Sequence, residues 1–246
     1  MKDSLDEREL QQFSAHSDKW WDESGPFAPL HLMNPTRLQY IKHHICMETG
    51  KAPDSSRPLK YLRILDAGCG GGLVCEPLTR LGADVTGLDA DQQAIDVAIA
   101  HSRAQGQDID YICSSTEALP GKYHESYDVI CALEIIEHVT SPADFIESLF
   151  TLLRPGGVIF ISTLNRTLKS WALGIIAAEY VLRWLPKGTH EWKKFQKPSE
   201  VSQMVRQSGG DVVNINGIVL DPFSRNFTLS KSDLGNNYIM TARKSV

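Results

Sequence analysis

The sequence predicts an α/β protein built on a Rossmann-like, doubly wound, mostly parallel sheet of seven strands. Apolar strand-like runs alternate with helical segments, a glycine-rich turn follows the first run, and an acidic residue ends the second. The chain has 246 residues, of which 42% are hydrophobic. This length suffices for one domain with a full core, so we expect a single domain over residues 1–246.

The elements are expected in the following order. Residues 1–58 should form an N-terminal helical cap and a linker, because prolines and serines gather at 51–58. Residues 59–246 should form the core. The expected strands are 61–66, 84–89, 109–113, 127–133, 158–162, 212–219 and 238–242. Helices are expected at 73–81, 91–104 and 142–153, the last closed by an Arg-Pro-Gly-Gly turn at 154–157.

The glycine-rich turn after residues 61–65 predicts a nucleoside-binding crevice. Gly68 and Gly70 let the backbone turn sharply and approach a ligand without a Cβ atom in the way. A dinucleotide fingerprint would need a third small residue at position 73, which is Leu73. The spacing therefore argues against NAD, although many strand-to-helix turns are rich in glycine.

Two acidic residues indicate which nucleoside would bind. Asp89 ends the second strand, where an acidic residue normally holds the ribose hydroxyls. Asp66 lies in the turn itself, where it would repel a pyrophosphate but suit a ligand with an ammonium and a sulfonium group. S-adenosylmethionine is such a ligand.

Composition excludes several classes of protein. The net charge of −5 and the pI near 5.9 give no general attraction to nucleic acid. The five cysteines include no Cys-x-x-Cys pair, which favours reduced thiols in an intracellular protein over thiolate-bound zinc. No secretory signal is present, and no run reaches the roughly 20 apolar residues of a membrane-spanning helix. We expect a protein that is soluble or peripheral to a membrane.

Several motifs outside the glycine turn carry a family resemblance. They are Trp20-Trp21-Asp22, Pro29-Leu30-His31, Asn34-Pro35-Thr36-Arg37, Glu134 to His138, Ser162 to Arg166, Pro186 to His190 and Lys194-Phe195. With them, nearly the whole chain resembles the class I S-adenosylmethionine-dependent methyltransferases. Within that class it looks like the ubiquinone-biosynthesis O-methyltransferases, which methylate polyprenylated phenols and catechols.

The resemblance implies cofactor contacts at Arg37, Gly68, Asp89 and Leu133. The Leu133 position is often methionine in this family, so its contact should be apolar packing. Arg37 suits the methionine carboxylate, because a planar guanidinium binds that group with two parallel hydrogen bonds. The alternative is an ordinary surface arginine. Asp66 and Gly70 complete the expected cofactor site.

A second cluster follows the strand that ends at Leu133. Glu134, Glu137 and His138 would share one face if this turn were helical. Such a set suits a divalent cation, and the resemblance implies magnesium. A metal would help because a phenol, with a pKa near ~10, is mostly protonated at neutral pH. The alternatives are a metal-free site with His138 as general base, assisted by Glu137, or glutamates that only cap the helix and pair with basic residues.

Residues 166–197 form an expected insertion that a small-molecule methyltransferase does not require. Residues 171–185 are apolar except for Glu179 and Arg183, and 166–197 carry seven basic residues against two acidic ones. Aromatic side chains beside basic ones suit a helix lying on an anionic membrane, where a polyprenylated substrate would be found. The alternative is a lid that covers the active site without meeting lipid.

The aromatic side chains of the cap and one histidine have two interpretations each. Trp20, Trp21, Phe27 and His31 either close the site from the side opposite the insertion or pack the core of the cap. His190 is either a second base or structural.

Together with the resemblance, these observations predict O-methylation of polyprenylated phenols or catechols in ubiquinone biosynthesis. The expected substrates are of the 2-polyprenyl-6-hydroxyphenol and 3-demethylubiquinol type. A soluble phenolic metabolite is an alternative substrate, and a non-catalytic scaffold that binds the cofactor is a rival from another class. Other proteins of ubiquinone biosynthesis are expected partners, and nucleic acid is not. The short N-terminus without an arginine-rich transit segment suggests a bacterial, cytoplasmic protein attached to the inner membrane.

Overall fold

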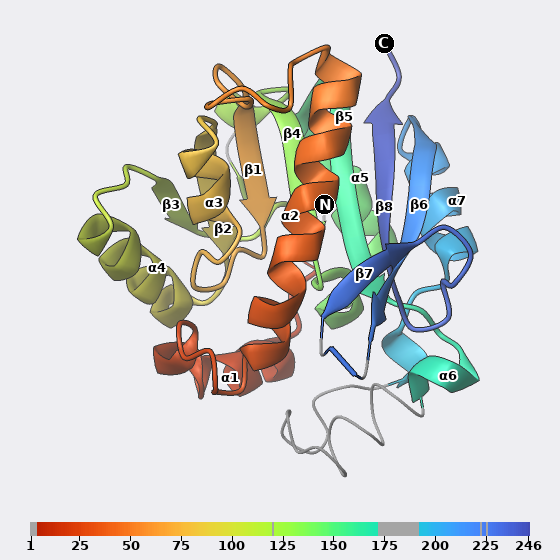
Figure 1. Cartoon of the computed structure of the whole chain (residues 1–246), viewed down its shortest axis with the longest axis horizontal. Helices are drawn as coiled ribbons and strands as arrows, with labels where there is room; N and C mark the ends of the chain where they lie inside the picture. Colours follow the sequence, from red (N-terminus) through yellow and green to blue (C-terminus); the bar gives the residue numbers. More distant parts are fainter. Residues whose placement is uncertain (1–3, 120, 172–191, 222, 225) are drawn as a thin grey trace.

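The computed structural model describes residues 4–119, 121–171, 192–221, 223–224 and 226–246. These residues form one sheet of eight strands with helices on both faces (Figure 1). The strands are β1 (Arg63–Ala67), β2 (Asp84–Asp89), β3 (Asp110–Cys113), β4 (Tyr127–Leu133), β5 (Leu153–Leu164), β6 (Gly210–Leu220), β7 (Phe227–Ser230) and β8 (Asn237–Lys244).

The strand order, β3-β2-β1-β4-β5-β8-β6-β7, is that of a doubly wound sheet. Strands β3, β2, β1, β4 and β5 are parallel neighbours, so their carboxyl ends share one edge of the sheet. The chain proceeds from β1 outward to β3 and returns to place β4 beside β1. Open α/β sheets bind their ligands at such a point of reversal, at the carboxyl ends of the strands.

The other side of the sheet is antiparallel. Strand β8 pairs with β5 on one side and β6 on the other, and β7 forms a hairpin with β6 at the edge. The predicted α/β class is confirmed, but the number of strands is eight, because β7 was missed. Its four residues are all exposed or half-exposed, so they carry no run of apolar side chains.

The helices lie in two layers. The α-helices are α1 (Glu7–Ser14), α2 (Ala28–Thr49), α3 (Cys75–Arg80), α4 (Gln92–Ala104), α5 (Pro142–Leu152), α6 (Leu168–Ser170) and α7 (Pro198–Gln207). Short 3-10 helices are η1 (Ser17–Lys19), η2 (Gly121–Tyr123), η3 (Ile136–His138) and η5 (Trp192–Lys194). Helices α2, α3 and α4 lie on one side of the sheet and α5 and α7 on the other, while α1 crosses the carboxyl edge (Figure 1).

The two apolar cores follow from alternation along the strands. Ile64 of β1 packs in the core under α2 and α3, and its neighbour Leu65 packs in the core under α5 and α7. Side chains on a strand point alternately to opposite faces, so a strand covered on both faces must be apolar throughout. This burial explains why β1 and β4 were recognisable in the sequence.

Local signals account for most element boundaries. Helix α2 begins with a proline in its first turn and ends at Gly50, whose φ of 68° a glycine adopts without strain. Strand β5 begins at Leu153, earlier than predicted, because Leu153 pairs with Tyr127 ahead of an irregularity in the ladder. None of the described helices is both long and apolar enough to cross a bilayer.

Candidate active site

A pocket opens at the carboxyl edge of the sheet, where the chain reverses from β3 to β4. Its walls come from the glycine turn, the ends of β2 and β3, the turn after β4 and the N-terminal residues. The lining residues include Ser4, Leu5, Asp6, Glu9, Leu10, Trp20, Gly68, Leu88, Asp89, Ser114 to Glu117, Glu134, Ile135, His138 and Phe145. Two predicted cofactor residues, Gly68 and Asp89, therefore share one pocket with Glu134 and His138 of the second cluster.

The glycine turn is held against β2 by its own backbone. The amides of Gly68 and Cys69 donate to the carbonyl of Leu88 at 2.8 and 3.0 Å. Gly68 has a φ of 77°, and a Cβ atom there would lie 2.9 Å from the side chain of Ile135. A side chain at position 68 would thus be strained and would fill the space where a ligand approaches the backbone.

Asp89 lies at the end of β2, as predicted, and faces the glycine turn. Its Oδ2 accepts a hydrogen bond from the Gly70 amide at 2.8 Å, and its Oδ1 accepts one from the Asp91 amide at 2.9 Å. Burial raises the pKa of Asp89, and these amide hydrogen bonds oppose the rise. Because each carboxylate oxygen can accept a second hydrogen bond, the group is suited to a ribose hydroxyl pair.

Asp66 is buried at the end of β1, with 2% of its surface exposed. The Cys75 thiol lies 3.2 Å from its Oδ2. Burial raises the pKa of Asp66 to about 6, while the Cys75 thiol and the charge of Arg37 lower it and the charge of Asp89 raises it. A carboxylate in this position favours a cationic ligand, because a positive charge would offset the cost of its burial.

Arg37 is not a surface arginine, since only 3% of it is exposed. Its Nη2 donates to Oδ1 of Asn34 at 2.8 Å, and Asn34 in turn donates to the carbonyl of Leu73 beside the glycine turn. Its Nη1 lies 4.0 Å from Oε1 of Glu134. In the described part of the chain, its buried Nε has no hydrogen-bond partner. A buried donor without a partner is costly, so this position fits an anionic ligand group such as a carboxylate.

The aromatic side chains of the cap cover the glycine turn. The Trp20 ring stacks on Phe27 with centroids 3.8 Å apart, and a Cβ atom on Gly70 would lie 2.4 Å from the Trp20 ring. Trp21 donates from Nε1 to the Gly71 carbonyl at 3.0 Å and stacks on His101. The cap therefore closes the site over the predicted cofactor turn.

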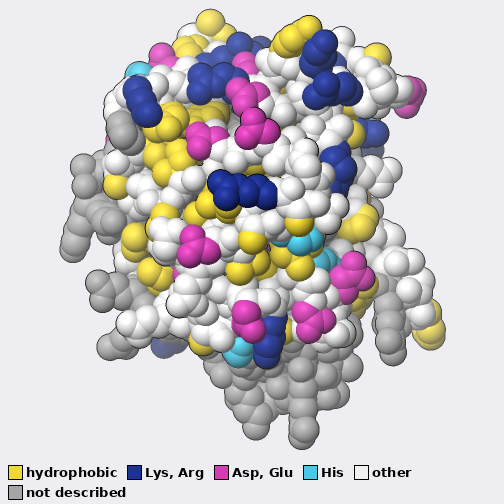
Figure 2. All heavy atoms as spheres, turned by 90° about the vertical axis from the view of Figure 1, so that its left-hand side faces the viewer, with side chains coloured by type: hydrophobic (Ala, Val, Ile, Leu, Met, Phe, Trp, Pro, Cys, Tyr) yellow, Lys and Arg dark blue, Asp and Glu magenta, His cyan; other side chains and the backbone are white. Residues whose placement is uncertain are grey.

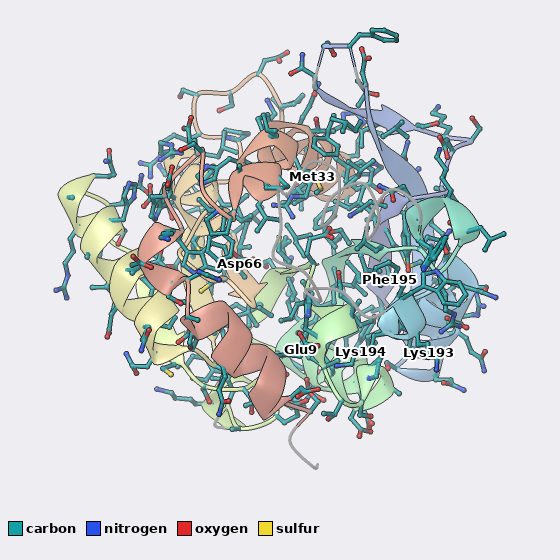
Figure 3. The ribbon with its side chains drawn as sticks, turned by 90° about the horizontal axis from the view of Figure 1, so that it is seen from below. Glu9, Met33, Asp66, Lys193, Lys194 and Phe195 are labelled. Carbon is teal, nitrogen blue, oxygen red and sulfur yellow. The ribbon has the colours of Figure 1, made fainter. Side chains whose placement is uncertain are left out.

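Helix α1 brings further residues that the sequence did not single out. Glu9 Oε2 accepts a hydrogen bond from His138 Nδ1 at 3.1 Å, and Glu9 Oε1 accepts one from Lys194 at 2.8 Å. Lys194 also pairs with Asp6 at 3.1 Å. Glu9 and Lys194 lie side by side between α1 and η5, whereas Lys193 lies farther out (Figure 3). Lys194 belongs to one of the family motifs, but nothing in the sequence around Glu9 reveals a partner 185 positions away.

The turn after β4 does not place Glu134, Glu137 and His138 on one helical face. Only residues 136–138 are helical, and Glu134 has a φ of 54°, outside the helical region. The Glu134 carboxylate accepts hydrogen bonds from Ser162 at 2.6 Å and Asn237 at 2.9 Å. The buried Glu137 accepts one from Thr163 at 2.8 Å. The three side chains therefore have different hydrogen-bond partners, although their charges still act on one another.

The same geometry bears on the predicted magnesium. Among the described residues, no group of three His, Cys, Asp or Glu side chains is placed to hold a metal ion. Divalent cations require several oxygen or nitrogen ligands around one point, and Glu134, Glu137 and His138 do not provide them. These residues do not fit a magnesium site in this arrangement, and no step proposed below passes through a metal.

The structure describes only some of the remaining residues that the sequence singled out. Leu133 is buried at the end of β4, consistent with an apolar contact. Residues 172–191, which include most of the predicted insertion and His190, lie outside the described residues. At the described start of the insertion, Leu168 is 79% and Trp171 46% exposed. On the face that Figure 2 shows, acidic side chains lie among the basic ones, so no continuous basic surface forms there.

Comparisons with known proteins agree on a methyltransferase. Residues 39–215 match the model of a methyltransferase domain family. The chain is 48% identical over 241 residues to the ubiquinone biosynthesis O-methyltransferase of Roseobacter denitrificans, covering 98% of this chain and 97% of the relative. It is 45% identical to the enzyme of the same name from Bartonella tribocorum, with the same coverage.

Solved structures support the fold. A magnesium protoporphyrin IX methyltransferase from Synechocystis with bound S-adenosylmethionine aligns over 100% of both chains, with a TM-score of 0.65 and 17% identity. A methyltransferase from Thermotoga maritima aligns over 97% of this chain and 100% of that chain, with a TM-score of 0.66 and 15% identity. At such identities the likeness concerns the fold alone.

Proposed function

The chain belongs to the ubiquinone biosynthesis O-methyltransferases, and from this membership we propose that it methylates a hydroxyl group of a polyprenylated phenol or catechol. The methyl donor is S-adenosylmethionine. We propose substrates of the 2-polyprenyl-6-hydroxyphenol and 3-demethylubiquinol type.

One observation carries the proposal. The glycine turn and Asp89, which suit a nucleoside, open into the same pocket as Glu134 and His138, which can handle a proton. A methyltransferase for hydroxyl groups needs this proximity, because the acceptor oxygen must lose its proton close to the methyl donor. A scaffold that only bound the cofactor would not need a basic side chain in the pocket.

The cofactor's groups have matching partners in this proposal. Arg37 binds the methionine carboxylate, for which its buried Nε remains without a partner among the described residues. The Asp66 carboxylate faces the positive charge of the ligand, and Asp89 accepts hydrogen bonds from the ribose hydroxyls. When bound, S-adenosylmethionine supplies a methyl group that a positively charged sulfur has already activated.

His138 is the proposed proton acceptor. Burial alone would lower the pKa of His138. The hydrogen bond to Glu9 and the charges of Glu137, Glu9 and Glu134 raise the pKa by more than burial lowers it, so the net shift is upward. A stronger base takes a phenol proton more readily once the imidazole is neutral. Glu137, whose carboxylate is bonded to Thr163, contributes through its charge on His138.

The proposal includes a membrane role for residues 166–197. The exposed side chains of Leu168 and Trp171 stand at its described start, and Lys193 and Lys197 are exposed at its described end. Exposed apolar and basic groups together suit the headgroup region of an anionic bilayer, where a polyprenylated acceptor would dissolve. We propose peripheral attachment to the bacterial inner membrane, with other ubiquinone-biosynthesis proteins as neighbours.

A transfer assay tests the function. Purified protein is incubated with labelled S-adenosylmethionine and a short-chain prenylated catechol, with and without added magnesium, and the methylated product is identified by mass spectrometry. Formation of the methyl ether in either condition supports the proposal. The alternative of a soluble phenolic substrate would be favoured if the protein did not methylate the prenylated catechol but did methylate an unprenylated catechol at every substrate concentration tested.

Vesicle flotation tests the membrane role. The protein should rise with vesicles containing phosphatidylglycerol and should remain behind with vesicles of phosphatidylcholine alone. Equal recovery with both kinds of vesicle would remove the electrostatic part of the proposal, and no recovery with either would remove the whole.

A further inference from the structure

We propose that Glu9 is a positioning residue for methyl transfer, which holds the imidazole of His138 from helix α1 and is itself held by Lys194. The inference rests on the proposed function, because it concerns the same pocket. It concerns a residue that lies far in sequence from the glycine turn and from the cluster after β4.

The hydrogen bond between Glu9 and His138 determines which ring nitrogen can accept a proton. Oε2 of Glu9 lies 3.1 Å from Nδ1 of His138. An ionised carboxylate only accepts hydrogen bonds, so Nδ1 must carry the hydrogen. In the neutral imidazole the proton acceptor is then Nε2. Glu9 thereby selects the tautomer and fixes the plane of the ring at the same time.

The two glutamates of the cluster after β4 have other hydrogen-bond partners. Glu137 is adjacent in sequence, but its Oε2 accepts the Thr163 hydroxyl on β5. Glu134 is bonded to Ser162 and Asn237. Both affect His138 through charge, whereas Glu9 also lies within hydrogen-bond distance of its ring. Removing Glu9 would therefore free the ring without removing the charges of the cluster.

Lys194 anchors the positioning residue. Its Nζ lies 2.8 Å from Oε1 of Glu9 and 3.1 Å from Oδ2 of Asp6, so it ties α1 to η5 (Figure 3). The Glu9 carboxylate thus uses one oxygen for Lys194 and the other for His138. Because η5 follows residues 172–191 directly, the base is held from both the cap and the end of the insertion.

Activity measurements with three variants test the role. Glu9→Leu keeps the size but loses the acceptor, whereas Glu9→Gln keeps an acceptor oxygen for Nδ1. We expect Glu9→Leu to lower kcat by about tenfold to hundredfold at saturating cofactor and prenylated catechol, and Glu9→Gln to recover most of that loss. Glu125→Leu is the matched control, since Glu125 also pairs with a lysine but lies before β4, at the opposite edge of the sheet.

A tautomer measurement gives a readout that activity does not. In ¹⁵N spectra recorded at a pH where the ring is neutral, His138, assigned by comparison with His138→Gln, should carry its hydrogen on Nδ1 in the wild type. In Glu9→Leu the hydrogen should move to Nε2, which is the tautomer that free imidazole side chains favour. Thermal unfolding of each variant shows that it is folded.

The outcomes are distinguishable. A folded Glu9→Leu variant with wild-type kcat, equal losses in Glu9→Leu and Glu9→Gln, or a wild-type ring protonated on Nε2 would each overturn the inference alone. A loss that lies wholly in KM for the cofactor would also overturn it, because it would make Glu9 a cofactor-binding residue. A wild-type protein that methylates no phenol would overturn the proposed function together with this inference.

Discussion

The guanidinium of Arg37 and the carboxylate of Glu134 lie 4.0 Å apart, between Nη1 and Oε1, at the point where α2 meets the end of β4. Both side chains are mostly buried, and the rest of the Glu134 carboxylate is bonded to β5 and β8. The pair therefore links the cap to the sheet at the pocket. It also keeps the Arg37 charge from being isolated when no ligand carboxylate is near.

Replacing Arg37 should weaken cofactor binding more than a simple change of charge would. Arg37→Lys keeps one positive charge but loses the planar fork, so the Kd for S-adenosylhomocysteine should rise about tenfold to hundredfold. Isothermal titration calorimetry measures this, with the exposed Arg103→Lys as control. A Kd within twofold of the wild type would show that Arg37 does not bind the carboxylate.

A methyl group on Gly70 should be far more harmful than one on Gly106. Both residues have positive φ, 50° and 66°, so alanine is strained at either position by about 1 kcal/mol. At Gly106 nothing lies within 4 Å of the new atom, whereas at Gly70 it would lie 2.4 Å from the Trp20 ring. Chemical denaturation should show a loss of about 1 kcal/mol for Gly106→Ala and a larger one for Gly70→Ala. Equal losses would mean that Trp20 moves away at little cost.

Gly70→Ala should also affect ligand binding, because the displaced Trp20 ring lines the pocket. Gly106→Ala should bind S-adenosylhomocysteine like the wild type. This comparison separates the steric effect from the backbone strain that the two variants share.

Stability without ligand should fall as the pH rises through the titration of Asp66. Burial raises its pKa to about 6 in the folded protein, above the ordinary value of 3.8. Between these values the unfolded chain releases the proton that the folded chain still holds, so the free energy of unfolding decreases with pH. The decrease is complete above about pH 6 and amounts to about 3 kcal/mol.

Asp66→Asn isolates this contribution, since burial also raises the pKa of other acids, among them Asp89 and Glu137. The difference in unfolding free energy between wild type and variant, measured by urea denaturation from pH 4 to 8, should change across pH 4–6 and stay level above. A difference that does not vary with pH would mean that the Asp66 pKa is not raised.

Trp171 should contribute to membrane attachment. It is 46% exposed just before residues 172–191, and tryptophan favours the boundary between headgroups and acyl chains. Trp171→Ser should reduce recovery with phosphatidylglycerol vesicles by at least about half, while the exposed Tyr61→Ser at the opposite edge should not. Unchanged flotation of Trp171→Ser would restrict the attachment to other residues.

The sequence predicted those parts of the fold that depend on local order. The buried strands β1 and β4, the glycine turn and the acid at Asp89 each have a signal within a few residues, and all lie as predicted. Strand β7 was missed because its four residues carry no apolar run, and its position follows only from the hairpin with β6.

The interior of the site was harder to predict, because it depends on contacts between distant segments. The spacing of Glu134, Glu137 and His138 suggested one helical face. Glu134 has a positive φ instead, and the two carboxylates accept hydrogen bonds from different hydroxyls, those of Ser162 and Thr163. Glu9 looked like one charge among many in the first residues. Only the fold brings it to His138, and no periodicity in the sequence encodes that approach.

The position of β8 has a consequence for biosynthesis. Strand β8 separates β5 from β6, so the β6–β7 hairpin cannot join the sheet through its own neighbours in sequence. The β6–β7 hairpin can pair within itself, but it joins the rest of the sheet only when residues 237–244 pair with both β5 and β6. Until then β5 is an unpaired sheet edge in the nascent chain, to which chaperones would bind. Substitutions that slow translation just before β8 would prolong the time for which this edge can aggregate.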